Sequence, residues 1–339
     1  MVTVHDVARA AGVSISTVSR ALATPQRVAA PTRERVTAAA RELGYRPNRA
    51  ASVLRAGRSG ALGLVVPDLA NPYFAAMAKG AQARARERGL GLFVVDTEED
   101  ADLEVEAVLG LAPQTDGLLL CSPRAAERSV AALADRPVVL VNQHVDGVPS
   151  VVVDHEAGMF RALEHLRALG HRRVAYVGGP ESSWSDARRR AGLAAASRRV
   201  GGVEVVPLGA FRPQVEGGRA AADLVVATGA TAVVTFNDLV AVGLVERLRA
   251  RGLAVPDDVS VVGCDDAYVA ELVTPALTTL RSDLRDVGRV AVDHLLRRIE
   301  GRAPDASEPG VVETRPVELV VRSSTAPPRP GAVDRPDPS

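Results

Sequence analysis

Residues 3–22 read TVHDVARAAGVSISTVSRAL, and this stretch decides the fold of the N-terminal part of the chain. Thr3 followed by Asp6 is typical of a capping box, so a first helix is expected to begin at the residue after Thr3. Gly12 allows the backbone to reverse, and Ser14 can cap a second helix that runs to Leu22. The stretch therefore predicts two short helices joined by a tight turn.

The second of these helices leaves a polar face outside the small core expected around Val7, Val18 and Leu22. A helix that lies in the major groove of DNA needs short polar side chains and Arg, because its first residues meet base edges while hydroxyls and Arg hold phosphates. The residues left on this outer face are Ile15, Ser16, Thr17, Ser19 and Arg20, most of them short and polar with one Arg. The pattern predicts a DNA-binding helix-turn-helix, and an ordinary helical hairpin is the alternative.

The next residues extend this unit. PTRERVTAAARELG, residues 31–44, predicts a third amphipathic helix with Val36 and Leu43 on its apolar face and Gly44 as its terminator. Residues 1–60 contain ten Arg and no Lys against three acidic residues, a net charge of +7. Because the whole chain has no net charge, residues 61–339 carry −7. This asymmetry indicates a localised binding face for a polyanion.

Beyond residue 60, apolar strands alternate with helices, as in parallel α/β proteins. One series of strands lies in residues 61–150, and a second series begins near residue 151 with SVVVD. Two lobes, one for each series of strands, are expected. No run of 18 apolar residues occurs although 47% of residues are hydrophobic, so no membrane span is expected. Since a helix cap stands at Thr3, we expect no signal peptide and a cytoplasmic location.

Other chemistry finds little support in the sequence. Cys121 and Cys264 each end an apolar strand without metal or redox spacing, so they are expected to be buried and structural. The six His residues show no metal spacing and are expected on the surface or in loops. No dinucleotide, P-loop, zinc-protease or nucleophile-elbow motif is present. We expect no cofactor, no metal and no catalytic residue. Residues 323–339, rich in Pro, are expected to form a disordered tail.

The motif T-x-x-D-V-A-x-x-A-G-V-S-x-S-T-V-S-R-x-L, followed by R-V-x-x-A-x-x-E-L-G-Y-x-P-N, resembles the lactose repressor (LacI/GalR) family of bacterial transcription regulators. The resemblance extends to about residue 322. It implies an N-terminal all-α helix-turn-helix headpiece and an α/β, periplasmic-binding-protein-like core of two doubly wound parallel-sheet lobes. The implied parts are a headpiece at 1–46, a hinge helix and linker at 47–60, and a core at 61–322, divided into an N-lobe at 61–150 and 282–300 and a C-lobe at 151–280 and 301–322.

The resemblance also implies DNA contacts. Ile15, Ser16 and Arg20 would read double-stranded operator DNA, and Leu54 would enter the minor groove from a hinge helix. The third helix lacks the Ser cap of many relatives, because Ala30 stands there. The full expected contact set is Thr3, Ser14, Ile15, Ser16, Thr17, Ser19, Arg20, Asn48, Arg49, Ala51, Leu54 and Arg55. No leucine heptads follow the core, so a homodimer is expected.

The residues just after each core strand are polar or aromatic, and ligands of such folds bind there. Rings beside carboxylates and amides suit a polyol. The resemblance sharpens this to a small effector, a sugar first and a nucleoside next. The expected contacts are Asn71, Tyr73, Phe74, Asp96, Ser122, Asp154, Ser183, Trp184, Arg189, Phe211, Asn237 and Asp265. Helix capping is the alternative role for Asp238 and Asp265, and core packing is the alternative for Phe74.

In the family, the lobes exchange chain, here near residues 142–154, 237–238 and 278–283. Effector binding would then rotate the lobes, repack the dimer interface and change the hinge helices that hold Leu54. Two other classes of protein remain as alternatives. One is a sugar- or nucleoside-binding protein, such as a transport receptor, and the other is a sugar-processing enzyme.

Overall fold

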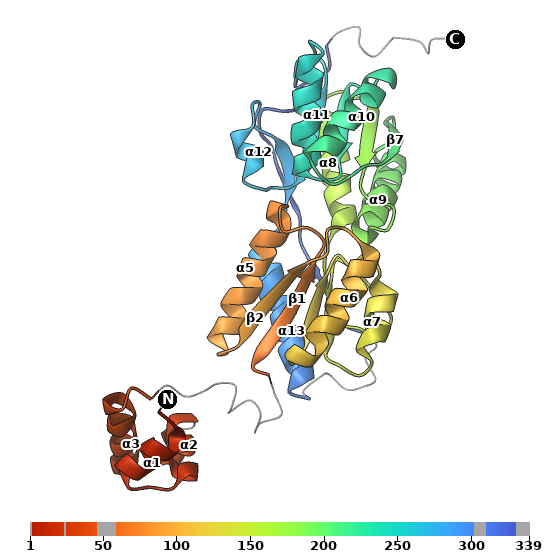
Figure 1. The fold of residues 1–339 in the computed structure, drawn as a ribbon. Coiled ribbons are helices and arrows are strands. Elements are labelled where there is room, and N and C mark those ends of the chain that lie inside the picture. The colour runs from red at the N-terminus through yellow and green to blue at the C-terminus, as the bar shows by residue number, and fades with distance from the viewer. Residues whose placement is uncertain (1, 24, 46–58, 302–309, 330–339) are drawn as a thin grey trace. The chain divides into compact units, whose positions relative to one another are not determined.

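The computed structural model describes residues 2–23, 25–45, 59–301 and 310–329. The chain divides into two compact units, Met1–Ser59 and Gly60–Ser339, which we call the headpiece and the core (Figure 1). Within the described residues, no helix has the length and apolar character needed to cross a bilayer.

The headpiece is helical. Its elements are α1 Val4–Ala11, α2 Ile15–Ala23, the short 3₁₀ helix η1 Pro25–Arg27 and α3 Ala30–Glu42. Thr3 and Asp6 form the expected capping box. The Asp6 carboxylate accepts hydrogen bonds from the Thr3 backbone N–H at 2.9 Å and from its hydroxyl at 2.7 Å. Gly12 has the left-handed φ of 65° that the reversal between α1 and α2 requires.

The headpiece core joins all three helices through Val7, Val18 and Val36, with small alanines between them. Leu22 is only partly buried against this cluster. Leu43 is 37% exposed, so its expected place on the buried face was wrong: it is the C-cap residue, where the helix has ended. The start of α3 has no side-chain cap hydrogen bond, in agreement with the missing Ser.

The core contains two six-stranded sheets. The N-lobe sheet has the order β11-β5-β4-β3-β1-β2 and is parallel throughout. Its strands are β1 Ala61–Val66, β2 Gly91–Asp96, β3 Leu118–Cys121, β4 Val138–Val141, β5 Ser150–Val153 and β11 Val312–Arg315. Its helices are α5 Pro72–Glu87, α6 Ala101–Leu111, η2 Ala112–Gln114, α7 Ala126–Leu133 and α13 Leu284–Ile299.

The C-lobe sheet has the order β12-β10-β9-β8-β6-β7, with only β12 antiparallel to its neighbour. Its strands are β6 Arg173–Gly178, β7 Glu204–Ala210, β8 Ala232–Thr235, β9 Ser260–Asp265, β10 Thr278–Arg281 and β12 Glu318–Val320. Its helices are α8 His155–Ala168, α9 Trp184–Val200, α10 Val215–Ala227, α11 Asp238–Ala250 and α12 Val269–Leu272.

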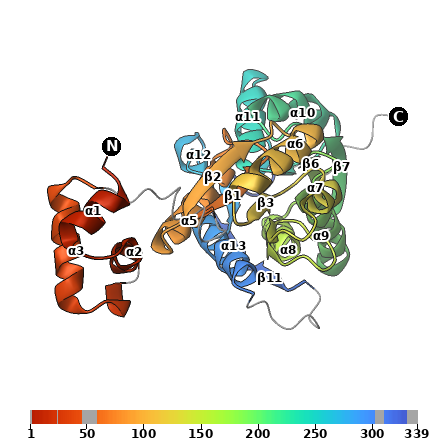
Figure 2. The same cartoon turned by 60° about the horizontal axis from the view of Figure 1, so that its bottom comes forward.

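Helices cover both faces of each sheet, so the inner strands, such as β1, β3, β4 and β8, are buried and read as apolar runs. In the N-lobe, α5 and α13 pack on one face and α6 and α7 on the other (Figure 2). In the C-lobe, α8 and α9 cover one face and α10 and α11 the other. The two doubly wound lobes are those that the sequence predicted.

The lobe boundaries differ from the expected ones. The strand SVVVD is β5 and pairs with β4, so it belongs to the N-lobe and not to the C-lobe. β11 also lies in the N-lobe sheet, because it pairs with β5. The chain therefore crosses between lobes at residues 153–155, 281–284 and 315–318. Residues 237–238 are no crossing, because they join β8 to α11 within the C-lobe.

The expected disordered tail begins too early. Ser324 is fully buried and its hydroxyl donates to the Val261 carbonyl at 2.6 Å. Val261 N–H donates in turn to the Ser324 carbonyl at 2.8 Å, and His171 lies 3.0 Å from the Ala326 carbonyl. Residues 323–329 are thus held by hydrogen bonds to the C-lobe, which composition alone does not reveal. Residues 330–339 lie outside the described part of the chain.

Candidate functional site

Helix α2 of the headpiece carries the residues expected to contact DNA. Three hydroxyls gather at its N-terminus: Ser14 Oγ lies 2.8 Å from both Ser16 Oγ and Thr17 Oγ1, and it accepts the Thr17 N–H at 3.2 Å. Ser16 and Arg20 are exposed. A helix N-terminus with outward hydroxyls and a nearby Arg is suited to phosphate and base-edge contacts.

Two other expected contacts have additional structural roles. Ile15 is partly buried against the headpiece core, so it contributes to stability as well as to any contact. The Thr3 hydroxyl is engaged by Asp6. The remaining expected contacts, Asn48, Arg49, Ala51, Leu54 and Arg55, lie outside the described residues.

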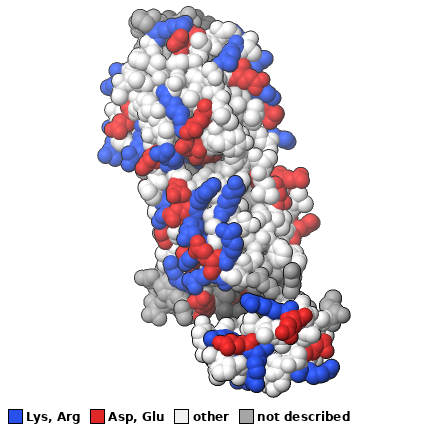
Figure 3. Space-filling view, turned by 90° about the vertical axis from the view of Figure 1, so that its left-hand side faces the viewer, with Lys and Arg blue, Asp and Glu red and all other residues white. Residues whose placement is uncertain are grey.

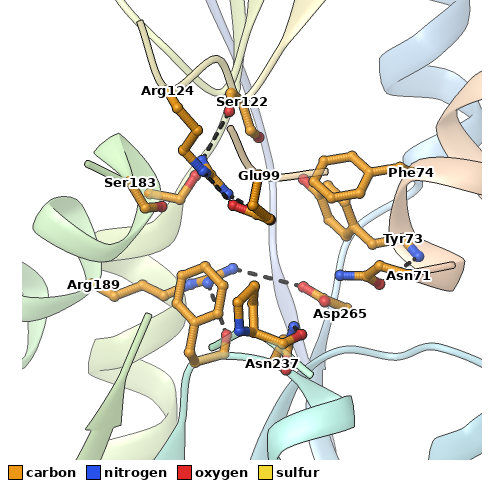
Figure 4. A pocket seen from close by; sticks show the side chains of 13 residues that line it. Asn71, Tyr73, Phe74, Glu99, Ser122, Arg124, Ser183, Arg189, Asn237 and Asp265 are labelled. Atoms are coloured by element: carbon orange, nitrogen blue, oxygen red, sulfur yellow. Dashed lines mark hydrogen bonds and ion pairs between the residues drawn. The ribbon is translucent and has the colours of Figure 1, made fainter. Parts of the chain in front are cut away.

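In the core, a narrow cavity lies between the two lobes, where the C-terminal ends of their strands face each other (Figure 4); its empty space, including the part open to solvent, is about 360 Å³. Residues that follow β1, β2 and β3 form its N-lobe wall, and residues that follow β6, β7, β8 and β9 form its C-lobe wall. Its lining residues are Asn71, Tyr73, Phe74, Glu99, Ser122, Arg124, Ser183, Ser185, Arg189, Pro213, Phe236, Asn237 and Asp265.

The aromatic part of the N-lobe wall is set by the start of α5. Asn71 caps this helix by accepting the Tyr73 N–H at 3.0 Å, so Tyr73 and Phe74 fall in its first turn. The two rings meet edge to face, with centroids 5.2 Å apart. The Asn142 side-chain amide donates to the Tyr73 hydroxyl, and its oxygen accepts the Val153 N–H at 2.9 Å. Tyr73 is thereby tied to the first crossing between the lobes.

The C-lobe wall is built around Arg189 of α9. Its Nη1 donates to the Phe236 carbonyl at 2.7 Å, and its guanidinium lies over the Phe236 ring at 4.5 Å. Its Nη2 is 3.6 Å from Asp265 Oδ1, too far for a strong hydrogen bond. Among the described residues its buried Nε has no hydrogen-bond partner. Arg189 therefore has donors that a bound hydroxyl could satisfy.

Carboxyl groups beneath this wall are held in dry surroundings. Burial raises the pKa of Asp265 to about 7, although Arg189 acts in the opposite direction. Burial, with the charge of Asp265, also raises the pKa of Asp238. Asp238 accepts the Thr279 hydroxyl at 2.6 Å and the Ala267 N–H at 2.8 Å. Asp238 thus supports the turn after β9, whereas Asn237 is the residue that caps α11.

A bidentate ion pair forms the other part of the N-lobe wall. Arg124 Nε donates to Glu99 Oε2 at 2.6 Å, and its Nη2 donates to Glu99 Oε1 at 3.0 Å. Arg124 Nη1 donates to the Ser122 carbonyl at 2.8 Å. The Glu104 carboxylate, itself buried, accepts N–H groups of residues 124 and 125. Arg124 is therefore held by groups besides Glu99.

Backbone strain concentrates at this edge of the sheets. Of the seven described non-glycine residues with positive φ, six lie at or within three residues of the C-terminal ends of strands β2, β3, β4 and β9: Glu98, Glu99, Ser122, Asn142, Asp265 and Asp266. Such conformations cost about 1–3 kcal/mol each and persist where the surrounding structure enforces them, commonly at functional sites. The strain thus marks the same edge as the cavity.

The structure brings eight of the twelve expected effector contacts to the cavity: Asn71, Tyr73, Phe74, Ser122, Ser183, Arg189, Asn237 and Asp265. Three of them also cap helices, namely Asn71, Ser183 and Asn237. Asn237 uses both atoms of its amide, because Oδ1 accepts the Val240 N–H at 2.9 Å and Nδ2 donates to the Pro213 carbonyl at 2.9 Å.

Four expected contacts do not line the cavity. Asp154 caps α8, and Asp96 accepts the N–H groups of Leu69 and Glu98. Trp184 packs against His155, with ring centroids 6.2 Å apart. Phe211 packs partly buried against the α10–α11 side of the sheet, and Phe236 occupies the aromatic position beside Arg189 instead.

The sequence reasoning missed five lining residues: Glu99, Arg124, Ser185, Pro213 and Phe236. It considered the residues just after each strand, but Glu99 and Arg124 stand three residues beyond β2 and β3. A charged residue at the same offset after two strands that follow each other in the sequence and flank β1 in the sheet was the available signal.

The histidines also differ from expectation. His155 and His294 are buried in helices α8 and α13, and His171 stands in a loop, as expected, but is buried there. Burial lowers the pKa of His171 to about 4 and lowers that of His155 well below its usual value. Cys121 and Cys264 are buried and unpaired, and burial raises the pKa of both thiols. Among the described residues, no group of three or more His, Cys, Asp or Glu side chains is placed to hold a metal.

Comparison with known proteins agrees with both units. Residues 3–48 match the family "Bacterial regulatory proteins, lacI family", and residues 163–325 match the "Periplasmic binding protein-like domain". The HTH-type transcriptional regulator DegA of Bacillus subtilis (strain 168) is 32% identical, over 96% of this chain and 98% of DegA.

Solved structures agree as well. The Lac repressor dimer bound to operator and the anti-inducer ONPF has a TM-score of 0.84 and 32% identity, over 96% of this chain and 99% of that one. The complex of the transcriptional regulator CelR with cellobiose has a TM-score of 0.69 and 29% identity, over 96% and 100% of the two chains. With a helix-turn-helix headpiece, a two-lobed core and relatives that match almost end to end, this chain belongs to the LacI family of bacterial regulatory proteins.

Proposed function

We propose that the protein is a sequence-specific transcription regulator, a repressor, whose affinity for operator DNA is set by a small sugar bound between the core lobes. The observation that carries this proposal is one chain with both a helix-turn-helix headpiece and an interlobe cavity lined by matched donors and acceptors. The similarity to the operator-bound Lac repressor dimer extends over both parts. The place of action is the cytoplasm, where bacterial DNA lies.

The lining chemistry supports a sugar. Arg189 offers donors, while Asp265 and Glu99 offer acceptors, and a hydroxyl group can satisfy either because it both donates and accepts. The rings of Tyr73 and Phe74 can cover the apolar C–H face of a sugar. The cellobiose complex of CelR is a solved structure of similar fold with a sugar bound. Every relative described above is a regulator, and we propose that the cleft binds its sugar without converting it.

The crossings provide the route from cavity to DNA. Among the described residues, three chain segments join the lobes, so closure around a ligand proceeds as a rotation. Tyr73 lines the cavity. The Asn142 side chain hydrogen-bonds both the Tyr73 hydroxyl and the Val153 N–H, and Val153 stands at the first crossing. A sugar that prefers one lobe arrangement shifts the population toward it. Whether the sugar releases or promotes operator binding then follows from which arrangement grips the DNA.

A homodimer completes the device. In the edge strand β2, Phe93 is 49% exposed and Val94 is 37% exposed. Consecutive residues of a strand point to opposite faces of the sheet, so both faces are partly uncovered at this edge. An apolar edge of this kind is a liability unless it is covered. We propose that a second copy covers it, as two half-sites of an operator require.

Two measurements test the proposal on the purified full-length protein. Selection from random duplexes should return a preferred, near-palindromic sequence, and a thermal-shift screen against neutral sugars and nucleosides should identify a ligand that raises the melting temperature. That ligand should then change the affinity for the selected duplex. Absence of any sequence preference, or a ligand that leaves operator affinity unchanged, would contradict the proposed regulation. Turnover of the sugar would favour an enzyme.

A further inference from the structure

The interlobe cavity holds two buried arginines, and each faces a carboxylate. Glu99 and Arg124 lie on one side of the cavity, and Asp265 and Arg189 lie on the opposite side (Figure 4). The two pairs differ in geometry. Glu99 fills the Arg124 fork with two short hydrogen bonds, whereas Asp265 is 3.6 Å from Arg189.

Glu99 stands where a ligand anion would otherwise bind. The paired nitrogen donors of Arg match the oxygens of a carboxylate or phosphate, which is why Arg recognises such groups in ligands. In this cavity the paired donors of Arg124, Nε and Nη2, are already bound to the Glu99 carboxylate. The Arg124 side chain is 3% exposed and that of Glu99 is 19% exposed, so the carboxylate is the more accessible member of the pair.

The loop after β2 fixes Glu99 in this position. Glu98 and Glu99 both have left-handed backbones, with φ of 52° and 63°. The Asp96 carboxylate accepts the Glu98 N–H at 2.9 Å, and the Glu99 N–H donates to the Pro67 carbonyl at 2.8 Å. Two consecutive strained residues are costly, and strain of this kind is typically kept where a side chain must be aimed. Here it aims Glu99 at Arg124.

We propose that Glu99 is a specificity-determining residue that restricts the cavity to neutral sugars, by occupying the Arg124 guanidinium that would otherwise bind the carboxylate of a uronate or the phosphate of a sugar phosphate. This inference rests on the proposed sugar-binding function. An anionic sugar entering the cavity meets the Glu99 charge at close range, and it gains Arg124 only if Glu99 is displaced. A neutral sugar disturbs neither ion pair.

The test compares anionic probes on three full-length proteins by isothermal titration calorimetry. The probes are D-glucuronate and D-glucose 6-phosphate, with D-glucose as their neutral parent and inorganic phosphate as a simple anion. Glu99→Gln should bind at least one of the three anions about tenfold or more tightly than the parent protein does, a gain worth about 1.4 kcal/mol. Glu98→Gln is the matched control, because it removes the same charge from the exposed neighbouring residue, and it should show no gain.

A double variant guards against misinterpretation. Glu99→Gln combined with Arg124→Gln removes the fork itself, so the gain in anion affinity must disappear, and thermal unfolding shows whether each variant is folded. The inference is overturned if folded Glu99→Gln gains no affinity for any of the three anions. It is also overturned if the parent protein prefers either anionic sugar to its neutral parent. Failure of every neutral sugar in the thermal-shift screen to bind, beside a gain for the anions in this titration, would instead reject the proposed neutral effector and leave the role of Glu99 standing.

Discussion

The Asp265 carboxyl is buried at the C-lobe wall of the cavity, and Arg189 offsets only part of the cost of ionising it there. Burial raises its pKa to about 7 from an ordinary value of 3.8. Between these values the folded protein keeps a proton that the unfolded chain has released, so this group makes stability fall as pH rises through that window.

Asp265→Asn should therefore become progressively more stable than the parent protein as pH rises from about 4 to about 7, by up to about 1.4 kcal/mol for each pH unit. Above about pH 7 the difference should level off, because Asp265 is then ionised in both states. Urea unfolding of the two proteins across this range measures the difference. A difference that stays constant with pH would show that Asp265 does not titrate as described.

Arg20 is exposed on α2 of the headpiece, the helix expected to enter the major groove. Arg20→Ala should weaken operator binding by about 1–3 kcal/mol and relax the preference for one base pair, if its guanidinium reads a base edge. Arg9→Ala is the control, since it removes the same charge from α1, where Arg9 lies 3.9 Å from Asp6. Fluorescence anisotropy on specific and mismatched duplexes measures the affinity of both variants. Equal losses of affinity for Arg20→Ala and Arg9→Ala would mean that Arg20 contributes only its positive charge.

At the scale of elements, the N-lobe depends on how closely α5 and α13 approach each other. A Cβ at Gly80 would lie 2.0 Å from the Arg285 carbonyl oxygen, and one at Gly288 would lie 2.2 Å from that of Met77. Ion pairs cross the same contact, including Arg84 with Asp293 at 2.7 Å. In Figure 3, charges of both signs mix over the side of the N-lobe that carries α5. The glycines allow the short distance between α5 and α13, and the ion pairs lie beside this contact.

Gly80→Ala should destabilise the core by about 1–3 kcal/mol, because the added methyl group forces the helices apart. Gly110→Ala in α6 is the matched control: no atom lies within 4 Å of its Cβ position, so better helix propensity should stabilise the protein by about 0.5–1 kcal/mol. Urea unfolding measures both. A similar change in the free energy of unfolding of both variants would mean that α5 and α13 can move apart without loss of stability.

The sequence predicted many of these elements because inner strands such as β3 and β4 are apolar runs and helices such as α1 and α13 have an amphipathic period, and both signals are local. Lobe membership is not local: β5 and β11 pair with each other although more than a hundred residues separate them. The same distinction applies to the cavity. Arg189 and Asp265 were expected from the resemblance to the family, whereas the pairing of Glu99 with Arg124 depends on two loops meeting in space.

The burial of particular polar residues could also not be predicted from the sequence. His155 and His171 have no apolar pattern around them that distinguishes core from loop, yet His155 lies 3.1 Å from the Ser185 hydroxyl and His171 lies 2.8 Å from that of Thr231. Ser324 is buried because the chain after β12 pairs with Val261. Each case is decided by a hydrogen-bond partner that is distant in sequence.

At the scale of the whole molecule, the charge distribution separates two kinds of binding. The positive charge belongs to residues 1–60, and residues 61–339 carry an equal negative charge. DNA should therefore contact the headpiece and be repelled by much of the core. The cavity, in contrast, balances its arginines with carboxylates. Operator binding and sugar binding should consequently respond differently to salt.

Operator affinity should fall steeply with ionic strength, since each neutralised phosphate releases counterions and the slope of log K against log salt is about −0.9 for each contact. With six to ten contacts, the loss between about 50 and 200 mM salt is on the order of a thousandfold or more. Affinity for a neutral sugar should change little over this range, because its contacts are buried and close to neutral. Anisotropy with the operator and calorimetry with the sugar, in the same buffers, measure the two slopes. A flat slope for DNA would remove the cationic headpiece as the contact surface, and a steep slope for the sugar would show that the cavity binds an ion.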